Sequence, residues 1–333
     1  MISSREIRLK SRPTGVLGPE HFELATVDVP PPRPGEVQVR NLWMSVDPYM
    51  RPRMNDVKSY VPPYEVGKPL DGRAVGEVIA TADPAFAQGD LVENGLGWRE
   101  VFNAPAKILR KLDTRGLPPQ VFLGVAGVPG FTAYVGLLKI AGLKEGDVVF
   151  VSAAAGAVGQ VVCQIAKAKG HKVIGSAGGP EKVAWLKEIG VDEVIDYKAE
   201  SSIRQALARA APEGIDVYFD NVGGAHLDAA LAMSKNFARF ALCGAISQYN
   251  TADRGNGVLT MAVAVQRRLR LQGFIILDHY DELPQFLRDM QQWIASGRMK
   301  WQETVESGLE NAPAALMKLF SGANLGKMLV KLA

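Results

Sequence analysis

Val148-Val149-Phe150-Val151-Ser152 runs directly into Ala153-Ala154-Ala155-Gly156-Ala157-Val158-Gly159, and a stretch with amphipathic helical spacing follows from Gln160 to Lys169. A strand, a turn of small residues and a helix in this order are typical of the start of a dinucleotide-binding βαβ unit. Glycines let a pyrophosphate approach the backbone, and the helix N-terminus carries partial positive charge. Ala154 replaces the first glycine of the usual pattern, and such turns also pack helices onto sheets without a ligand. The turn alone leaves both interpretations open.

The strand predicted over 171–176 ends without an acidic residue, where an Asp or Glu would hold the ribose hydroxyls of NAD. Ser176-Ala177-Gly178-Gly179 stands there instead, and Lys182 follows in the first turn of the next predicted helix. A cation can meet the additional phosphate of NADP, and the missing acid removes a charge that would repel it. Lys182 alone is compatible with an ordinary surface lysine. Together the two observations favour NADP(H).

Strands and helices continue to alternate beyond this point. The pattern predicts a helix over 201–211 and strands over 191–197, 215–220, 237–244 and 269–276. Such alternation predicts an α/β fold with a doubly wound parallel Rossmann sheet, whose ligands lie at the carboxyl ends of the strands. The residues at these ends are Tyr197, Asn221, Gly244 and Phe274.

Length and composition indicate two domains with substantial cores, since the chain has 333 residues of which 47% are hydrophobic. The net charge of +3 is small and the basic residues are scattered, so no nucleic-acid partner is expected. No run approaches the roughly 18 apolar residues of a membrane span. The segment 1–10 is too polar for a signal peptide. We therefore expect a soluble, cytoplasmic protein without a membrane partner.

The cysteines and histidines show no metal-ligand spacing. Cys163 and Cys243 give no disulfide framework, and we expect both to be small buried hydrophobic residues. The four histidines are dispersed along the chain, and none pairs with another ligand at a spacing suited to zinc. We expect no metal site.

The N-terminal part has a different pattern. Apolar and polar residues alternate over 22–29 and 36–43, and short strands with turns follow over 72–80 and 89–93. Short strands with frequent proline and glycine predict a mostly antiparallel, barrel-like domain.

Two further segments complete the organisation. The apolar segment 124–137 turns helical near Thr132 and leads into the nucleotide-binding part. A last strand over 326–332 is expected to return to the N-terminal domain, because the nucleotide-binding sheet already has its strands. The predicted domains are a barrel-like domain of residues 1–125 plus 300–333 and a Rossmann domain of residues 126–299.

This order of parts resembles the medium-chain dehydrogenase/reductase superfamily over nearly the whole chain, and it implies a GroES-like N-terminal catalytic domain. The chain is most similar to the zinc-free, NADPH-dependent double-bond reductases, which include prostaglandin, plant alkenal and bacterial curcumin reductases. The motifs that carry the resemblance are SVDPYMR (45–51), VPGFTAY (128–134), GSAG (175–178), YK (197–198), DNVGG (220–224), CGAISQYN (243–250) and NLGK (324–327).

The resemblance implies a role for each matching residue. Lys182 and Tyr197 would contact the region of the adenosine 2′-phosphate. Asn221 and Asn324 would hold the cofactor further along, and Pro48, Tyr49, Thr132 and Tyr249 would line the reaction site. The full set of implied cofactor contacts is Pro48, Thr132, Ala154, Gly156, Val158, Gly159, Ser176, Gly178, Lys182, Tyr197, Asn221, Gly244, Tyr249, Phe274, Ile276 and Asn324.

Three positions differ informatively from relatives. Asp47 and Pro48 stand where zinc-dependent members carry cysteine and histidine ligands, which agrees with the absence of a metal site expected from composition. Val128 stands where methionine is commoner in the group, which changes the shape of the pocket and not its chemistry.

Reduction of an electron-poor double bond delivers a hydride to the β-carbon and leaves enolate charge on the carbonyl oxygen. Without a metal, a tyrosine hydroxyl or the cofactor's ribose hydroxyl can stabilise that oxygen, and a tyrosine or water can protonate the α-carbon. Tyr249 is the first candidate and Tyr49 the second. Either one can instead be an aromatic wall of the pocket.

The sequence thus predicts NADPH-dependent reduction of the double bond of α,β-unsaturated aldehydes or ketones. Two alternatives remain open: an NADPH:quinone reductase, and a redox sensor that binds NADPH without turnover. The family resemblance also implies a homodimer formed through the nucleotide-binding domains. The substrate itself is not readable, because loops such as 60–64, 95–98 and 250–257 would shape its pocket.

Overall fold

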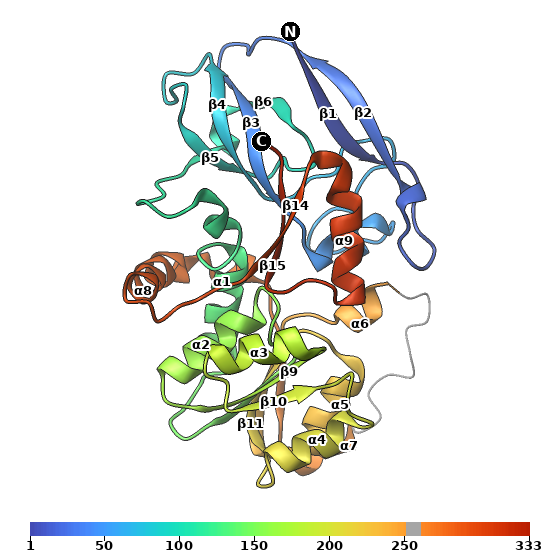
Figure 1. Ribbon diagram of the computed structural model, residues 1–333, viewed down its shortest axis with the longest axis vertical. Coiled ribbons are helices and arrows are strands. Elements are labelled where there is room, and N and C mark those ends of the chain that lie inside the picture. Colours follow the sequence, from blue (N-terminus) through green and yellow to red (C-terminus); the bar gives the residue numbers. More distant parts are fainter. Residues whose placement is uncertain (251–260) are drawn as a thin grey trace. The chain divides into compact units, whose positions relative to one another are not determined.

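The computed structural model describes residues 1–250 and 261–333 (Figure 1). The chain forms two compact units, the first of residues 1–123, 304–324 and 328–333, and the second of residues 124–303 and 325–327. Most of the expected pocket loop 250–257 lies outside the described residues. Among the described helices, none has the length and apolar character needed to cross a membrane.

The first unit contains nine strands and one α-helix, α9 (Ala312–Ser321). The strands are β1 (Ile2–Leu9), β2 (Phe22–Val29), β3 (Glu36–Ser45), β4 (Ala74–Thr81), β5 (Leu91–Asn94), β6 (Val101–Pro105), β7 (Arg110–Lys111), β14 (Glu303–Ser307) and β15 (Lys327–Lys331). β1 and β2 form a separate antiparallel pair, and the others form a seven-stranded sheet in the order β14-β15-β3-β4-β5-β7, with β6 also pairing with β3. The predicted antiparallel N-terminal domain is confirmed.

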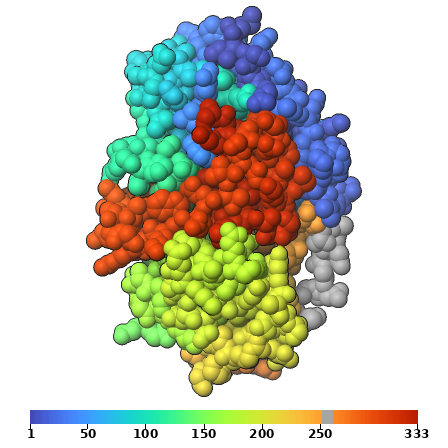
Figure 2. Space-filling model, in the orientation of Figure 1, coloured from blue at the N-terminus to red at the C-terminus, as the bar shows by residue number. Residues whose placement is uncertain are grey.

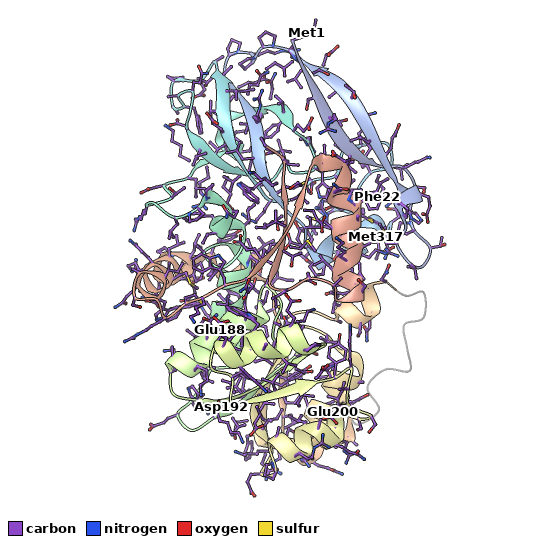
Figure 3. The ribbon with its side chains drawn as sticks, viewed as in Figure 1. Met1, Phe22, Glu188, Asp192, Glu200 and Met317 are labelled. Carbon is purple, nitrogen blue, oxygen red and sulfur yellow. The ribbon has the colours of Figure 1, made fainter. Side chains whose placement is uncertain are left out.

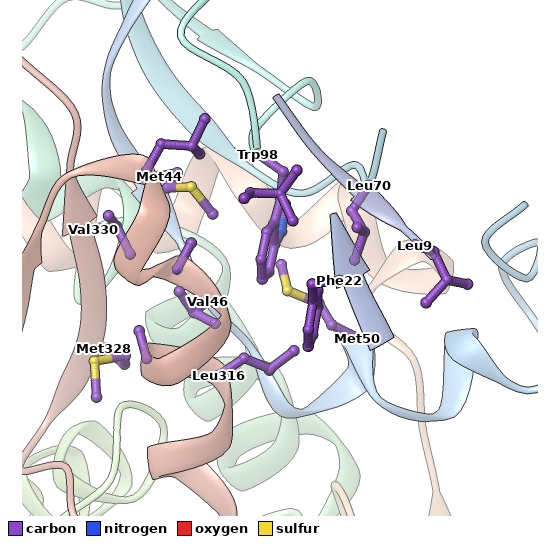
Figure 4. Packing of buried hydrophobic residues seen from close by; sticks show 14 of the residues in the cluster. Leu9, Phe22, Met44, Val46, Met50, Leu70, Trp98, Leu316, Met328 and Val330 are labelled. Atoms are coloured by element: carbon purple, nitrogen blue, oxygen red, sulfur yellow. The ribbon is translucent and has the colours of Figure 1, made fainter. Parts of the chain in front are cut away.

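The final strand joins the first unit as predicted, because β15 pairs antiparallel with β3 and places Leu329 opposite Ser45. Its side chains enter a core in which the rings of Phe22 and Trp98 stack with centroids 5.9 Å apart (Figure 4). Helix α9 closes this core with Leu316, and Phe22 and Met317 mark the same region in Figure 3.

The core also fixes one short helix. Met50 is fully buried in it and ends the 3₁₀ turn η2 (Pro48–Met50). Two proline-led turns follow one another here, since η3 (Pro52–Met54) buries Met54 in the same core. Pro48 and Tyr49 are thereby held at the edge of a packed region.

The second unit holds a six-stranded parallel sheet in the order β10-β9-β8-β11-β12-β13. The strands are β8 (Val148–Val151), β9 (Lys172–Ala177), β10 (Glu193–Asp196), β11 (Ile215–Asp220), β12 (Ser234–Leu242) and β13 (Arg270–Gly273). Numbered along the chain, this is the strand order 3-2-1-4-5-6 of the doubly wound fold, so the predicted fold class is confirmed.

Helices cover both faces of this sheet, which explains the continuous apolar run of β8. Figure 1 shows α2 and α3 on one face and α4 and α5 on the other. The helices of this unit are α1 (Val128–Tyr134), α2 (Gly159–Ala168), α3 (Pro180–Glu188), α4 (Ile203–Ala210), α5 (Gly224–Ala232), α6 (Ile246–Tyr249), α7 (Ala262–Gln266) and α8 (Leu283–Ala295). The strand order reverses between β8 and β11, so the carboxyl ends of these two strands form the crevice where such sheets bind ligands.

Helix α2 differs from the amphipathic helix that its sequence predicts, because its first eight residues are all buried. Its polar residues, Gln160 and Gln164, do not face solvent. The Gln164 side chain donates to the carbonyl of Lys300 and accepts from its N–H, both at 2.8 Å, and Gln160 makes the same two-sided contact with Gln302 at 3.3 and 3.1 Å. The two side-chain amides therefore pair with the backbone of residues 300–302, in the way that the backbone of a neighbouring strand would.

Two local features near β13 were not predicted. The strand ends at Gly273, so Phe274 and Ile276 lie beyond it. Helix α1 continues as a π-helical segment, η6 (Val135–Ile140). A Cβ on Gly136 would lie 2.6 Å from both Phe219 and Phe274, so only glycine allows these two rings to pack on this segment.

Candidate functional site

The turn after β8 is built by backbone geometry. Ala153 has a positive φ of 46°, and the Ala154 N–H donates to the Ser176 carbonyl at 2.9 Å. A Cβ on Gly159 would lie 2.3 Å from the Ala153 carbonyl oxygen, so this position tolerates no side chain. Gly156 is less restricted, with 3.1 Å between its Cβ position and the same oxygen. The turn leads through Val158 to the N-terminus of α2, which suits it to an anion.

Ala154 replaces the usual first glycine without a clash. Its methyl group is fully buried and points toward Gly175 on β9, where a Cβ would come within 3.0 Å of it. A side chain at 175 would thus be crowded by the methyl group of Ala154, and also by Leu186 and Val191 at 3.2 and 3.3 Å. The altered motif keeps the geometry of the turn.

The C-terminal motif reaches this turn through Gly326, whose N–H donates to the Ala155 carbonyl at 2.9 Å. Gly326 has a φ of 67°, and a Cβ there would lie 1.8 Å from the Gln302 carbonyl oxygen. Asn324 precedes this segment and belongs to the first unit.

A second cluster lies at the carboxyl ends of β9 and β10, and we call Gly178, Gly179, Lys182, Tyr197 and Lys198 the phosphate corner. The Tyr197 ring and the Lys198 side chain pack over Gly178, where a Cβ would lie 2.8 Å from the ring and 3.0 Å from Lys198. The Asp196 carboxylate ties the corner together by accepting from the N–H groups of Gly179 at 3.0 Å and Lys198 at 3.1 Å.

The phosphate corner is electropositive. Burial lowers the pKa of the Lys182 ammonium, and the charge of Lys198 lowers it further. A dianionic phosphate between the two cations would relieve both effects. Sequence reasoning proposed Lys182 but not Lys198 as a cofactor contact. The signal for Lys198 was the Tyr197-Lys198 dipeptide, because it follows the strand next to β9.

Acidic residues elsewhere on the second unit form ion pairs with other cations. Glu188, Asp192 and Glu200, labelled in Figure 3, pair with Lys300 at 3.2 Å, Lys167 at 2.7 Å and Arg209 at 2.6 Å. The segments that carry these acids form a continuous surface of the second unit in the space-filling view (Figure 2). These three acids are thus paired with cations outside the phosphate corner, whereas the carboxylate of Glu181 acts on Lys182 and raises its pKa against the larger effect of burial.

The turn after β11 is organised by a buried carboxylate. Asp220 accepts hydrogen bonds from the N–H groups of Val222 at 2.9 Å and Gly223 at 2.8 Å, and from the Tyr218 hydroxyl at 2.7 Å. Burial raises the pKa of Asp220 against these hydrogen bonds, which favour the carboxylate. The turn presents Asn221 at the crevice, and its side-chain N–H donates to the Ser152 carbonyl at the end of β8, 2.8 Å away.

Tyr249 lies beside Gly244 at the end of β12. Its hydroxyl oxygen accepts the Ala245 N–H at 3.2 Å and stands 3.3 Å from the position of a Cβ on Gly244. The short helix α6 that carries it is tied to the Asn221 turn, since the Ser247 hydroxyl donates to the Val222 carbonyl at 2.6 Å. Burial raises the pKa of the Tyr249 phenol, and the Ala245 N–H opposes that shift.

Three other predicted contacts in the second unit have defined settings. Thr132 is half-buried on α1 and donates back to the Val128 carbonyl at 2.8 Å. The Phe274 ring meets Phe219 edge-on with centroids 6.3 Å apart, and Ile276 begins the 3₁₀ segment η7 (Ile276–Glu282).

In the first unit, the structure brings Pro48 and Tyr49 together on η2. Burial raises the pKa of the Tyr49 phenol, and the Asp47 carboxylate raises it further. The positive charge of the Arg53 guanidinium opposes these effects and lowers the pKa of the Tyr49 phenol. The same guanidinium stands 4.0 Å from the centroid of the Tyr64 ring.

The described residues hold no group of three or more His, Cys, Asp or Glu side chains able to bind a metal ion. Asp47 and Pro48 stand where zinc-dependent members of the superfamily carry ligands. The Ser45 hydroxyl donates to the Asp47 carboxylate, and the side chain of Pro48 has no atom that can bind a metal. These two residues do not form a donor set that fits zinc.

Family models match most of both units. Residues 5–112 match the N-terminal domain of oxidoreductase, and residues 157–292 match the zinc-binding dehydrogenase model. The chain is 42% identical to the NADP-dependent 2-alkenal reductase of Nicotiana tabacum, covering 99% of this chain and 97% of that protein. It is 41% identical to the NADPH-dependent curcumin reductase of Escherichia coli, over 98% of this chain and 96% of that protein.

Solved structures agree with these relatives. The structure of CurA from Vibrio vulnificus in complex with NADPH matches with a TM-score of 0.93 and 42% identity, covering 99% of both chains. The resemblance that the motifs predicted is thereby confirmed. The chain belongs to the medium-chain dehydrogenase/reductase family, in the group that contains the NADP-dependent 2-alkenal and curcumin reductases.

Proposed function

We propose that this protein reduces the carbon–carbon double bond of α,β-unsaturated aldehydes and ketones with NADPH. The observation that carries the cofactor assignment is the phosphate corner, where Lys182 and Lys198 approach each other closely enough for one charge to lower the pKa of the other. The names of the relatives support the reaction, because they are 2-alkenal and curcumin reductases that cover nearly the whole chain.

The described residues fit NADPH in three places. The turn of Ala154, Gly156, Val158 and Gly159 offers close backbone approach at a helix N-terminus, as a pyrophosphate requires. The phosphate corner offers two cations and a tyrosine to the 2′-phosphate. Asn221 is fixed at the crevice by its bond to Ser152, where the remaining part of the dinucleotide would pass.

Bound NADPH supplies the hydride that the β-carbon of the substrate accepts. The chain must then stabilise the negative charge that develops on the carbonyl oxygen. Tyr249 suits this role, since its oxygen accepts the Ala245 N–H and, among the described residues, no acceptor takes its own proton. Burial keeps the phenol protonated by raising its pKa, while the Ala245 N–H strengthens it as a donor.

Tyr49 is the second candidate for the same role. Its phenol retains its proton at neutral pH, because burial and the Asp47 carboxylate both raise its pKa. The nearby carboxylate makes Tyr49 a weaker acid than Tyr249, which has a backbone N–H at its oxygen. Tyr249 therefore remains the first candidate.

The boundaries of the two domains and the cellular location complete the proposal. The catalytic domain comprises residues 1–125 plus 300–333, and the NADP-binding domain comprises residues 126–299. The protein acts in the cytoplasm, which its free cysteines support, because a reducing compartment keeps thiols unpaired.

The proposed assembly is a homodimer that uses the edge of the parallel sheet. In the described residues, β13 pairs with β12 alone, so its outer edge offers unpaired backbone groups. The helix α7 that precedes it exposes 81% of Val265, which a partner would cover. The family resemblance implies a homodimer formed through the nucleotide-binding domains, and this edge belongs to that domain.

We expect the purified protein to oxidise NADPH with an alkenal and with an enone, giving the saturated carbonyl compound. With the 4-position of the cofactor deuterated, mass spectrometry should find the label on the β-carbon of the product. Oxidation with quinones alone would replace the proposal with quinone reduction. Tight NADPH binding without turnover on all three substrate classes would identify a binding protein.

Lys182→Ala should reduce the preference for NADPH over NADH. Loss of a charged phosphate contact costs about 1.5–3 kcal/mol, which corresponds to roughly 10- to 150-fold in the ratio of the two kcat/KM values. Lys198→Ala should lower the same ratio by a smaller factor, because Lys198 is more exposed. Lys187→Ala, an exposed position in the last turn of α3, is the matched control. An unchanged ratio in Lys182→Ala would remove Lys182 from the cofactor site.

Tyr249→Phe should lower kcat at least about tenfold, since a positioned proton donor contributes this much or more. The dissociation constant of NADPH should change little, because the ring remains in place. Tyr49→Phe distinguishes the two candidates: full turnover in Tyr249→Phe together with a loss in Tyr49→Phe would transfer the role to Tyr49. Full turnover in both would leave the ribose hydroxyl or water as the donor.

Light scattering of the purified protein should give about twice the chain mass of 35.9 kDa. Val265→Asp should shift the protein toward the single-chain mass on dilution, because the new charge would have to be desolvated in the interface. Val16→Asp, at an exposed residue of the first unit, should leave the mass unchanged. A single-chain mass for the parent protein at all concentrations would contradict the dimer.

A further inference from the structure

A buried polar pair lies beneath the phosphate corner. His226, on α5, and Ser176, near the end of β9, are hydrogen-bonded between Nε2 and Oγ at 2.9 Å. Their exposed fractions are 6% and 0%, so neither side chain reaches a ligand at the surface. Ser176, a predicted cofactor contact, thus directs its hydroxyl inward to His226.

The same imidazole supports the tyrosine of the corner. The rings of His226 and Tyr197 meet edge to face, with centroids 5.5 Å apart and planes at 81°. Tyr197 in turn packs over Gly178. One side chain from α5 therefore contacts the residue near the end of β9 and the residue that follows β10, the two strands whose ends form the corner.

The His226 ring holds its neighbours by contact and carries no charge. Burial lowers the pKa of His226 to about 4, so the imidazole is neutral at physiological pH. A neutral imidazole has one donor and one acceptor nitrogen, and Nε2 is engaged with Ser176. Positive charge at the corner comes from Lys182 and Lys198.

We propose that His226 is a positioning residue for the 2′-phosphate of NADPH, which holds Tyr197 and the end of β9 in the arrangement that the phosphate requires. His226 thereby contributes to the preference for NADPH over NADH. The inference rests on the proposed NADPH dependence and adds a residue that touches neither cofactor nor substrate.

Direct binding to the unliganded protein tests this role. His226→Leu replaces the imidazole with an apolar side chain of similar size, which cannot form the bond to Ser176. We expect its dissociation constants for NADPH and for adenosine 2′,5′-bisphosphate to rise about fivefold, the range of one neutral hydrogen bond. The dissociation constant for NADH and kcat at saturating NADPH should stay within about twofold, because neither depends on the 2′-phosphate.

Three further variants separate positioning from folding. His226→Gln places an amide group near the position of Nε2 without restoring the ring, and it should recover the part of the affinity for NADPH that depends on the bond to Ser176. In His226→Leu combined with Ser176→Ala, the loss should not exceed that of His226→Leu, because the two residues form one unit. His171→Leu removes another 6% exposed histidine of the same unit, at the opposite end of β9, and should leave the ratio of NADPH to NADH affinity unchanged.

Equal weakening of NADPH and NADH in His226→Leu would overturn the inference in favour of a general structural role. Unchanged affinity for all three ligands, or no recovery in His226→Gln, would also overturn it. The parent protein tests the proposed function separately: if it binds NADH as tightly as NADPH, the cofactor assignment fails before any variant is compared.

Discussion

The carbonyl oxygen of Ala153 leaves no room for a side chain at Gly159, and the rest of the second unit depends on this close approach. The oxygen lies 2.3 Å from the position of a Cβ there, so α2 can start directly beneath the turn. Because α2 starts there, Gln160 and Gln164 face the segment 300–302, and the Ala155 carbonyl meets the N–H of Gly326. The absence of a side chain at Gly159 therefore lets α2 start where its glutamines meet residues 300–302 and where the turn meets Gly326.

Much of this fold is readable from the sequence because its signals are local. Strands with continuous apolar residues alternate with helices, which predicts a parallel sheet buried on both faces, and the small-residue turn fixes its first βα connection. The prediction of Lys182 as a phosphate contact has the same local basis, since a missing acid and a nearby cation lie a few residues apart. The return of the last strand to the first unit followed from counting strands.

The features that sequence reasoning missed depend on contacts between distant segments. Gln160 and Gln164 look like the polar face of an amphipathic helix until residues 300–302 are placed against them. The π-helical segment contains Gly136, on which Phe219 and Phe274 pack, and both rings lie far away in sequence. His226 was one of four dispersed histidines, and only the fold brings it to Ser176 and Tyr197.

A side chain at position 175 would meet three neighbours at once, since its Cβ would lie 3.0 Å from the Ala154 methyl group, 3.2 Å from Leu186 and 3.3 Å from Val191. The turn after β8, helix α3 and the segment before β10 therefore all pack onto the same glycine of β9. Enlarging residue 154 or residue 175 would push these neighbours apart, so the bare backbone at Gly175 is what lets the first three strands of the sheet and their connections pack tightly.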